Sequence, residues 1–157
     1  QNKMEVVNVT GINGKLDSKL NKEMFCNILT LGSMCNDCIV ENKKVSGEPT
    51  EAAIVNAAIK YNAYMKNDNR VNEIPFDSKR KMMTTIHRNK TGYKVITKGA
   101  IDVLLQKSSY YYEKGKEEKL QLFLILSGIK AYWKAKPSSA HLTFKFSIVH
   151  VSHTEIT

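Results

Sequence analysis

Seven positively charged side chains follow one another between positions 79 and 98 with no acidic residue among them: Lys79, Arg80, Lys81, Arg88, Lys90, Lys94 and Lys98. Residues 1–78 carry nine basic and ten acidic side chains, whereas residues 79–157 carry fifteen and five, so the second half holds all of the net charge of +9. Such a field attracts phosphates, whether they belong to a nucleotide, a nucleic acid or an anionic lipid.

One glycine-rich segment, residues 11–15, approaches a phosphate-binding loop in composition. Its spacing does not satisfy G-x-x-x-x-G-K-[ST], and Leu16 stands where the magnesium-binding hydroxyl should be. No G-x-G-x-x-G segment occurs elsewhere in the chain. We interpret residues 11–15 as a plain turn, so that any nucleotide would be held by a different geometry.

Three cysteines, Cys26, Cys35 and Cys38, are an odd and small number for a disulfide scaffold, and we interpret them as thiols. Zinc binding by Cys35-x-x-Cys38 with Cys26 would need ligands from the tail histidines, more than a hundred residues away: His141, His150 and His153. His87 is the only histidine in the well-patterned part, and no G-x-S-x-G or H-E-x-x-H occurs. We therefore expect neither a metal site nor catalytic residues.

The chain of 157 residues, 42% hydrophobic and 25% charged, is typical of one soluble globular domain spanning residues 1–157. No apolar stretch approaches the ~18 residues of a membrane helix. No basic and apolar leader opens the chain, so we expect no signal peptide in it.

Apolar residues spaced by three and four predict two helices. The first covers residues 21–35, and the second begins at the Gly47-Glu48-Pro49-Thr50-Glu51 segment, where proline and acids suit a first turn. The second helix is expected to end at residues 67–69. The predicted buried positions are Met24, Phe25, Ile28, Leu31 and Cys35 in the first, and Ile54, Ala57, Ala58, Tyr61 and Met65 in the second.

β-branched and alternating residues predict strands at 4–9, 71–76, 81–88 and 93–98, the last two joined by a turn at residues 89–92. A short helix is expected over residues 100–107. Further predicted elements are a helix from Lys116 to about Lys136 and a final strand over residues 141–151.

Three ordered motifs carry a resemblance: Gly47-Glu48-Pro49-Thr50-Glu51-Ala52-Ala53, Pro75-Phe76-Asp77-Ser78-Lys79-Arg80-Lys81-Met82-Met83 and Lys98-Gly99-Ala100. Together they resemble the nucleotide-binding domain of P-type cation-transporting ATPases, most closely calcium pumps. The resemblance covers roughly residues 1–107. It implies an α+β fold in which an antiparallel β-sheet is flanked by helices and ATP is held in a shallow pocket.

The resemblance also implies residue roles. The aromatic ring of Phe76 stacks on adenine, Lys98 lies at the pocket floor, and Lys81 reaches the phosphates. Glu51 hydrogen-bonds near the adenine amino group, with Glu48 beside it. The candidate nucleotide-binding residues are Glu48, Thr50, Glu51, Phe76, Ser78, Lys81, Lys98 and Gly99. Taken singly, Phe76 would be expected in the core and Lys98 as a solvated strand residue.

The chain lacks a motif that the family uses for catalysis, and this limits the expected function. The chain has no D-K-T-G-T motif, so we expect this fragment to bind ATP without turnover, whereas the full-length pump would use ATP with Mg²⁺. The implied partners are the phosphorylation, actuator and membrane domains of the same full-length chain, at the cytoplasmic face of a membrane. The fragment itself is expected to be soluble and monomeric.

The tail departs from the family. No arginine follows Arg88, although family members use a late arginine against the nucleotide phosphates. Residues 108–157 match no part of the family pattern. Two interpretations stay open: a divergent closing helix and strand, or a segment foreign to the domain, such as the product of a reading-frame change.

Two other functions remain as alternatives. A small basic nucleic-acid-binding domain is favoured by the charge of the second half and by possible stacking groups, although no nucleic-acid motif occurs. The stacking groups are Tyr110, Tyr111, Tyr112 and Trp133. A protein-binding scaffold that uses the helix from Lys116 is the other.

Overall fold

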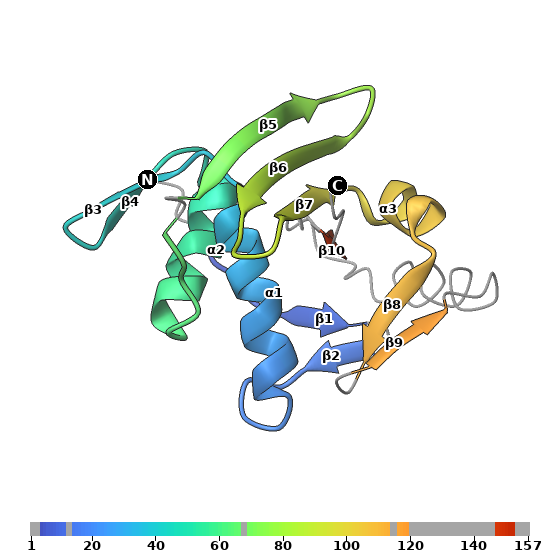
Figure 1. Cartoon of the computed structure of the whole chain (residues 1–157). Helices are drawn as coiled ribbons and strands as arrows, with labels where there is room; N and C mark the ends of the chain where they lie inside the picture. Colours follow the sequence, from blue (N-terminus) through green and yellow to red (C-terminus); the bar gives the residue numbers. More distant parts are fainter. Residues whose placement is uncertain (1–3, 12–13, 67–68, 114–115, 120–146, 153–157) are drawn as a thin grey trace.

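The computed structural model describes residues 4–11, 14–66, 69–113, 116–119 and 147–152. Within them, helices and antiparallel sheets form an α+β fold (Figure 1). The largest sheet has the strand order β10-β7-β6-β5, and every neighbouring pair is antiparallel. Its strands are β5 (Arg70–Asp77), β6 (Met82–Arg88), β7 (Tyr93–Gly99) and β10 (Ser147–Ser152).

Alternation in the sequence sets the two faces of this sheet, as predicted. Ile96 and Lys98 of β7 are buried, as are Met83, Thr85 and His87 on the same face of β6. The C-terminal end of α1 (Lys22–Met34) packs on this face, where Met34 and Cys35 meet Met83 and Ile96. The strands predicted at residues 71–76, 81–88 and 93–98 are found as β5, β6 and β7, except that Lys81 lies in the turn before β6.

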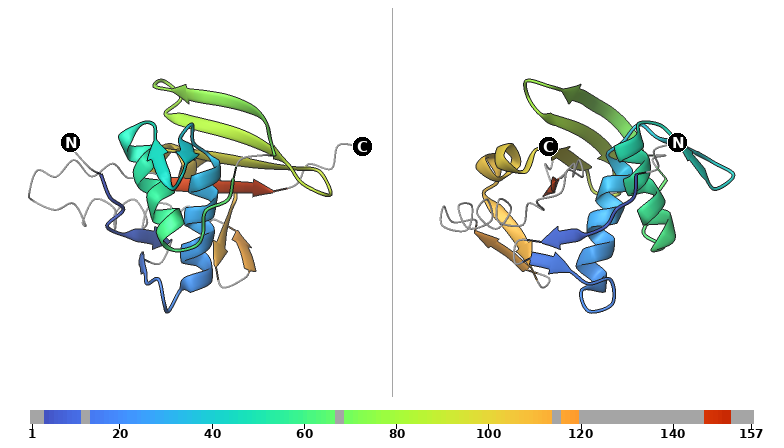
Figure 2. Two further views of the ribbon diagram at one scale, coloured as in Figure 1. Left: turned by 90° about the vertical axis from the view of Figure 1, so that its left-hand side faces the viewer. Right: turned by 180° about the vertical axis from the view of Figure 1, so that it is seen from behind.

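The helix α2 (Pro49–Lys60) lies beside α1, as Figure 2 shows from two further sides. Ala57 and Ala58 are buried against Phe25 and Leu29 of α1, and their small side chains allow the close approach. A third helix, α3 (Ile101–Lys107), follows β7 directly. All three helices begin within two residues of the predicted starts.

The predicted end of α2 at residues 67–69 is wrong. The helix stops at Lys60 because Asn62 adopts a left-handed φ of 54°. The amide of Ala63 donates to the carbonyl oxygen of Ala58 at 2.7 Å and that of Asn62 to Ile59 at 3.1 Å, which is the Schellman end of a helix. Two residues placed in its buried stripe, Tyr61 and Met65, are therefore beyond the helix and exposed.

Three two-stranded hairpins complete the described elements. They are β1 (Val9–Gly11) with β2 (Gly14–Leu16), β3 (Ile39–Glu41) with β4 (Lys44–Ser46), and β8 (Tyr110–Glu113) with β9 (Lys116–Lys119).

The hairpins correct two predictions. The strand expected at residues 4–9 is found only from Val9, where pairing with β2 begins, and residues 4–8 are not in a strand. The helix expected from Lys116 begins instead as β9, because residues 116–119 pair with β8. The remainder of that helix, together with residues 141–146 of the final predicted strand, lies outside the described residues; β10 bears out the rest of that strand up to Val151.

Candidate functional site

The register of the sheet places Phe76 and Lys98 at one level on strands separated only by β6. Ile74 pairs with Thr84 and Asp77 with Met82, so β5 takes three steps where β6 takes two. This bulge sets both Pro75 and Phe76 opposite Met83, which itself pairs with Lys98. Two strand spacings make about 10 Å between the two backbones. The register thus brings the two positions to the same part of the sheet.

Phe76 and Lys98 have the opposite exposure from that expected of a phenylalanine and a lysine from residue type alone. The side chain of Phe76 is 59% exposed, whereas Lys98 is only 2% exposed. The Lys98 ammonium forms an ion pair with Oε1 of Glu51, whose side chain is 14% exposed. A buried ammonium needs such a partner, because its desolvation would otherwise cost several kcal/mol. The exposed ring and the partnered lysine thus differ from a core phenylalanine and a solvated strand lysine.

The start of α2 brings Glu51 to this position. Glu48 is its N-cap residue, and its Oε2 accepts the amide hydrogens of Thr50 at 2.9 Å and of Glu51 at 3.1 Å. The hydroxyl of Thr50 also donates to Oε2 of Glu48. Pro49 occupies the first turn, where its missing N–H leaves no donor unpaired. Glu48 and Thr50 therefore fix the turn from which Glu51 reaches Lys98.

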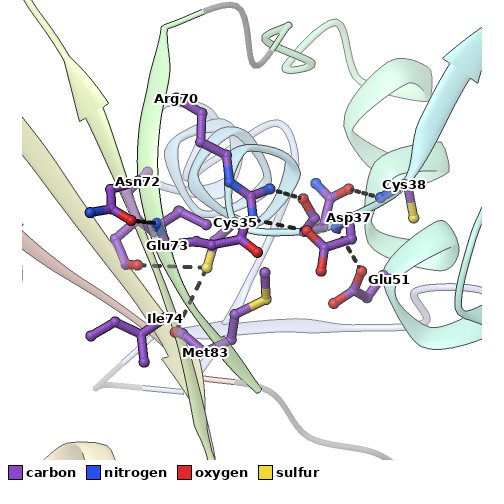
Figure 3. Close-up of polar contacts among 12 residues, drawn as sticks. Cys35, Asp37, Cys38, Glu51, Arg70, Asn72, Glu73, Ile74 and Met83 are labelled. Carbon is purple, nitrogen blue, oxygen red and sulfur yellow. Dashed lines mark hydrogen bonds and ion pairs between the residues drawn. The ribbon is translucent and has the colours of Figure 1, made fainter. Parts of the chain in front are cut away.

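A network around Arg70 holds the other side of Glu51 (Figure 3). The amide of Asp37 donates to Oε2 of Glu51 at 2.9 Å, and the carboxylate of Asp37 accepts a bond from Arg70 at 2.8 Å. Arg70 also donates to the carbonyl oxygen of Asn36 at 2.8 Å and forms an ion pair with Glu73. Through these bonds β5 fixes the segment that follows α1, and that segment fixes Glu51.

The thiols of Cys35 and Cys38 lie in the same segment, and all three cysteines are free. The Cys35 thiol is directed at the carbonyl oxygens of Met83 and Ile96, at 3.8 and 3.6 Å, and burial raises its pKa. Burial, then the carboxylate of Glu51, raises the pKa of Cys38 to about 11. Both remain protonated near neutral pH, so neither is an activated nucleophile.

The turn between β5 and β6 carries Ser78 and Lys81, which are both exposed. The amide of Lys81 donates to the carbonyl oxygen of Asp77 at 2.6 Å, and Lys81 has a left-handed φ of 55°. A lysine in this region of φ is uncommon, and turns at functional sites often hold such residues.

Gly99 has a packing reason to be glycine. A Cβ at this position would lie 2.3 Å from the carbonyl oxygen of Lys81, which also accepts the amide of Ala100 at 3.1 Å. The turn that carries Lys81 is thereby fastened to the end of β7 next to Lys98.

The eight candidate residues therefore fall into two groups. Glu48, Thr50 and Glu51 begin α2, and the other five lie on or between β5, β6 and β7: Phe76, Ser78, Lys81, Lys98 and Gly99. The Glu51–Lys98 ion pair joins the two groups. Two arginines lie beside them: Arg70 was not singled out from the sequence, and Arg80 was named only as a member of the basic run and of the second motif. An arginine at the start of a strand or within a basic run gives no signal of which carbonyl groups it will contact.

His87 lies on the buried face of β6 outside these groups. Its Nε2 is 2.9 Å from the hydroxyl of Thr85, and its Nδ1 is buried with no hydrogen-bond partner among the described residues. Burial lowers the pKa of His87, and the nearby charges of Arg70 and Lys94 lower it further. His87 is thus a neutral core residue near pH 7 and not a general base exposed to a ligand.

Comparison with protein families decides the identity. Residues 21–129 match the family model described as the P-type ATPase cytoplasmic domain N, which is more than half of the chain. The chain belongs to this family. The match includes residues 108–129, so the prediction that residues 108–157 match no part of the family is wrong for that stretch.

Curated relatives agree with the family. The N domain is 38% identical over 127 residues to calcium-transporting ATPase 1 of Bacillus cereus, and this covers 76% of the chain and 14% of that protein. It is 41% identical over 97 residues to a calcium-transporting ATPase of Bacillus subtilis, covering 56% and 11%. A yeast relative, calcium-transporting ATPase 1 of Saccharomyces cerevisiae, is 34% identical over 116 residues, covering 69% and 12%. The chain thus spans a small fraction of its relatives' length.

The described residues contain neither a cluster of metal ligands nor a membrane-spanning helix. Among them, no group of three or more histidine, cysteine or acidic side chains is arranged to hold a metal ion. No helix in the same part of the chain is long and apolar enough to cross a membrane. Two of the tail histidines considered for zinc, His141 and His153, lie outside the described residues.

Proposed function

We propose that this N domain binds ATP where Phe76 and Lys98 share one level of the sheet. The observation that supports the proposal is an exposed ring and a buried ammonium whose backbones lie at one level of the sheet, two strand spacings apart. An exposed aromatic face suits stacking on a purine, and lysines neutralise the charge of a triphosphate. A chain that needed neither function would favour the ring inside and the lysine outside.

Each remaining candidate residue has a proposed part in the same site. Lys81 is directed to the phosphates from its turn, with Ser78 beside it, while Glu51 and Glu48 lie toward the adenine amino group. Thr50 and Gly99 hold the backbones that carry these side chains. Mg²⁺ would accompany the phosphates in the full-length pump.

We further propose the role of this domain in the full-length protein. Because the relatives are named as calcium-transporting ATPases, the whole chain is proposed to be a calcium pump whose N domain delivers the terminal phosphate of ATP to an aspartate. That aspartate would lie on the phosphorylation domain, and the actuator and membrane domains complete the machine at the cytoplasmic face of a membrane. The chain alone is proposed to turn over no ATP, since it has no D-K-T-G-T acceptor motif. It is also proposed to be monomeric.

Titration of the ¹⁵N-labelled chain with ATP tests the binding site. We expect amide shifts to concentrate at Phe76, Lys81, Lys98 and Gly99, with a dissociation constant of ~0.1 to several mM for a shallow site. The β3–β4 hairpin should not respond. ADP and AMP should bind with similar strength, because stacking provides most of the recognition.

Two outcomes would contradict the proposal. The nucleic-acid alternative would be supported if the shifts were spread over the basic surface and were abolished by physiological salt. An oligonucleotide would then reproduce the shifts, and AMP would not compete with it. Acid-stable labelling of the chain by radioactive ATP would show that the fragment carries its own phosphate acceptor.

A further inference from the structure

Arg80 belongs by sequence to the basic run that attracts phosphates, yet its guanidinium is turned toward its own main chain. Nη2 donates to the carbonyl oxygens of Met82 at 3.0 Å, Ile74 at 3.3 Å and Pro75 at 3.4 Å. This nitrogen carries two hydrogens, so the two longer contacts share one of them. Nε is buried and has no hydrogen-bond partner within the described part of the chain. The head group therefore lies against the β5–β6 turn.

The groups that Arg80 contacts lie on both sides of Phe76. Ile74 and Pro75 come directly before it, and their carbonyl oxygens accept bonds from the side chain. On the other side, Oδ1 of Asp77 accepts the main-chain amide of Arg80 at 2.6 Å. Phe76 is thus fastened at both neighbours to a single residue.

The bulge makes this support necessary. Two residues of β5 oppose one of β6 at this point, so the ladder of main-chain hydrogen bonds is interrupted beside Phe76. The ring is mostly exposed and gains little packing to orient it. The direction of its Cα–Cβ bond depends on the backbone, and Arg80 connects that backbone to Met82 of β6 between the ladder pairs on either side of the bulge.

We propose that Arg80 is a positioning residue: it holds the bulge so that the ring of Phe76 is presented to adenine, and it does not contact the phosphates. This inference rests on the proposed function, because it requires Phe76 to bind the base. All three bonds come from Nη2, which lies one bond farther from Cα than the Nζ of a lysine, so a lysine at the same place does not reach the same three oxygens.

The consequence for affinity follows from the population of the competent backbone. If the bulge samples other conformations, the apparent dissociation constant rises by the inverse of the fraction that remains competent. The rise is the same for adenosine and for ATP, because the ligand's phosphates take no part. A residue that acted through its charge would instead weaken ATP more than adenosine.

The experiment compares Arg80→Gln, Arg80→Lys and the matched control Lys79→Gln, which removes the same charge from the neighbouring position. Affinities for adenosine, AMP and ATP are measured by amide NMR. Amide shifts outside residues 74–82 that are the same in each variant as in the unmodified chain confirm that the variant is folded. We expect both Arg80 variants to bind all three ligands about three- to tenfold more weakly. Lys79→Gln should bind adenosine as the unmodified chain does.

A double-mutant comparison separates positioning from a general structural role. In a Phe76→Ala background, Arg80→Gln should cause no further loss of adenosine affinity, because the ring that it positions is gone. An equal loss in both backgrounds would overturn the inference, and so would a loss for ATP alone or full binding by Arg80→Lys. If Arg80→Gln does not fold, Arg80→Lys carries the same comparison. If the unmodified chain binds none of adenosine, AMP and ATP, the proposed function is refuted, and the inference with it.

Discussion

Truncation of Phe76 and of Phe25 removes the same atoms from two places that differ in exposure. Phe76 is 59% exposed, and Phe25 is 7% exposed with its ring 4.8 Å from that of Tyr61 in an edge arrangement. Phe76→Ala should weaken nucleotide binding and leave the domain folded. Phe25→Ala should lower stability and leave the binding of the remaining folded protein unchanged.

The magnitudes follow from the buried area. A buried phenylalanine covers about 200 Å², so the hidden two-fifths of Phe76 amounts to about 80 Å² and at most about 2 kcal/mol of stability. Phe25→Ala should cost about 3–5 kcal/mol, as for other buried aromatic side chains. Loss of stacking on a base is worth roughly 1–3 kcal/mol, which weakens binding about 5- to 150-fold.

The assay pairs urea unfolding of each variant with titrations of ATP, ADP and AMP. Phe76→Ala should weaken all three nucleotides by similar factors, since they share the adenine. The reasoning is refuted if Phe76→Ala unfolds as readily as Phe25→Ala while its folded fraction binds ATP normally. Phe76 would then be a core residue, and the proposed site would lose its platform.

Three further predictions concern the residues around the site. The pKa of His87 is lowered in the folded domain, so as pH falls through about 6.5 the unfolded chain takes up a proton before the folded one does. The free energy of unfolding should therefore decline below that pH. His87→Gln should make the decline smaller, as measured by urea unfolding at pH 5 and pH 7. Glu51→Gln removes the carboxylate that is ion-paired with the buried Lys98 ammonium and should cost about 3–5 kcal/mol, whereas the double variant Glu51→Gln with Lys98→Met should recover much of this; equal stability of the single and the double variant would contradict a buried ion pair. Gly99→Ala must displace the carbonyl of Lys81, so its melting temperature should fall by an amount equivalent to about 1–3 kcal/mol, and an unchanged melting temperature would show that the turn yields freely.

The elements predicted best from sequence are those whose period persists over several residues. Alternation over β7 and the three- and four-residue spacing of α1 both gave the element and its buried face. Even so, Leu29 of α1 is buried and was not in the predicted stripe. Periodicity identifies a face, and the neighbouring α2 decides which residues at its margin are covered.

The elements that sequence reasoning missed are short or depend on an unusual backbone. Strands β3 and β4 have three residues each, too few for a period, and their turn places Asn42 and Lys43 at φ of 49° and 63°. Turns of this type are recognised most readily by glycine, which is absent here. Asn62 ends α2 in the same left-handed region while apolar residues continue beyond it. In both cases a residue other than glycine adopts a positive φ, which the sequence pattern does not predict.

The environments of Phe76 and Lys98 could not be read from residue type, because each depends on a contact distant in sequence. The buried ammonium of Lys98 is ion-paired with Glu51, 47 positions earlier, whose carboxylate comes from the start of α2. Phe76 is aligned with Lys98 only because β5 gains one residue against β6. Local propensity contains neither the ion pair nor the bulge. The three motifs in family order predicted the family, and the proposed site was assembled from that resemblance and not from the properties of any single residue in it.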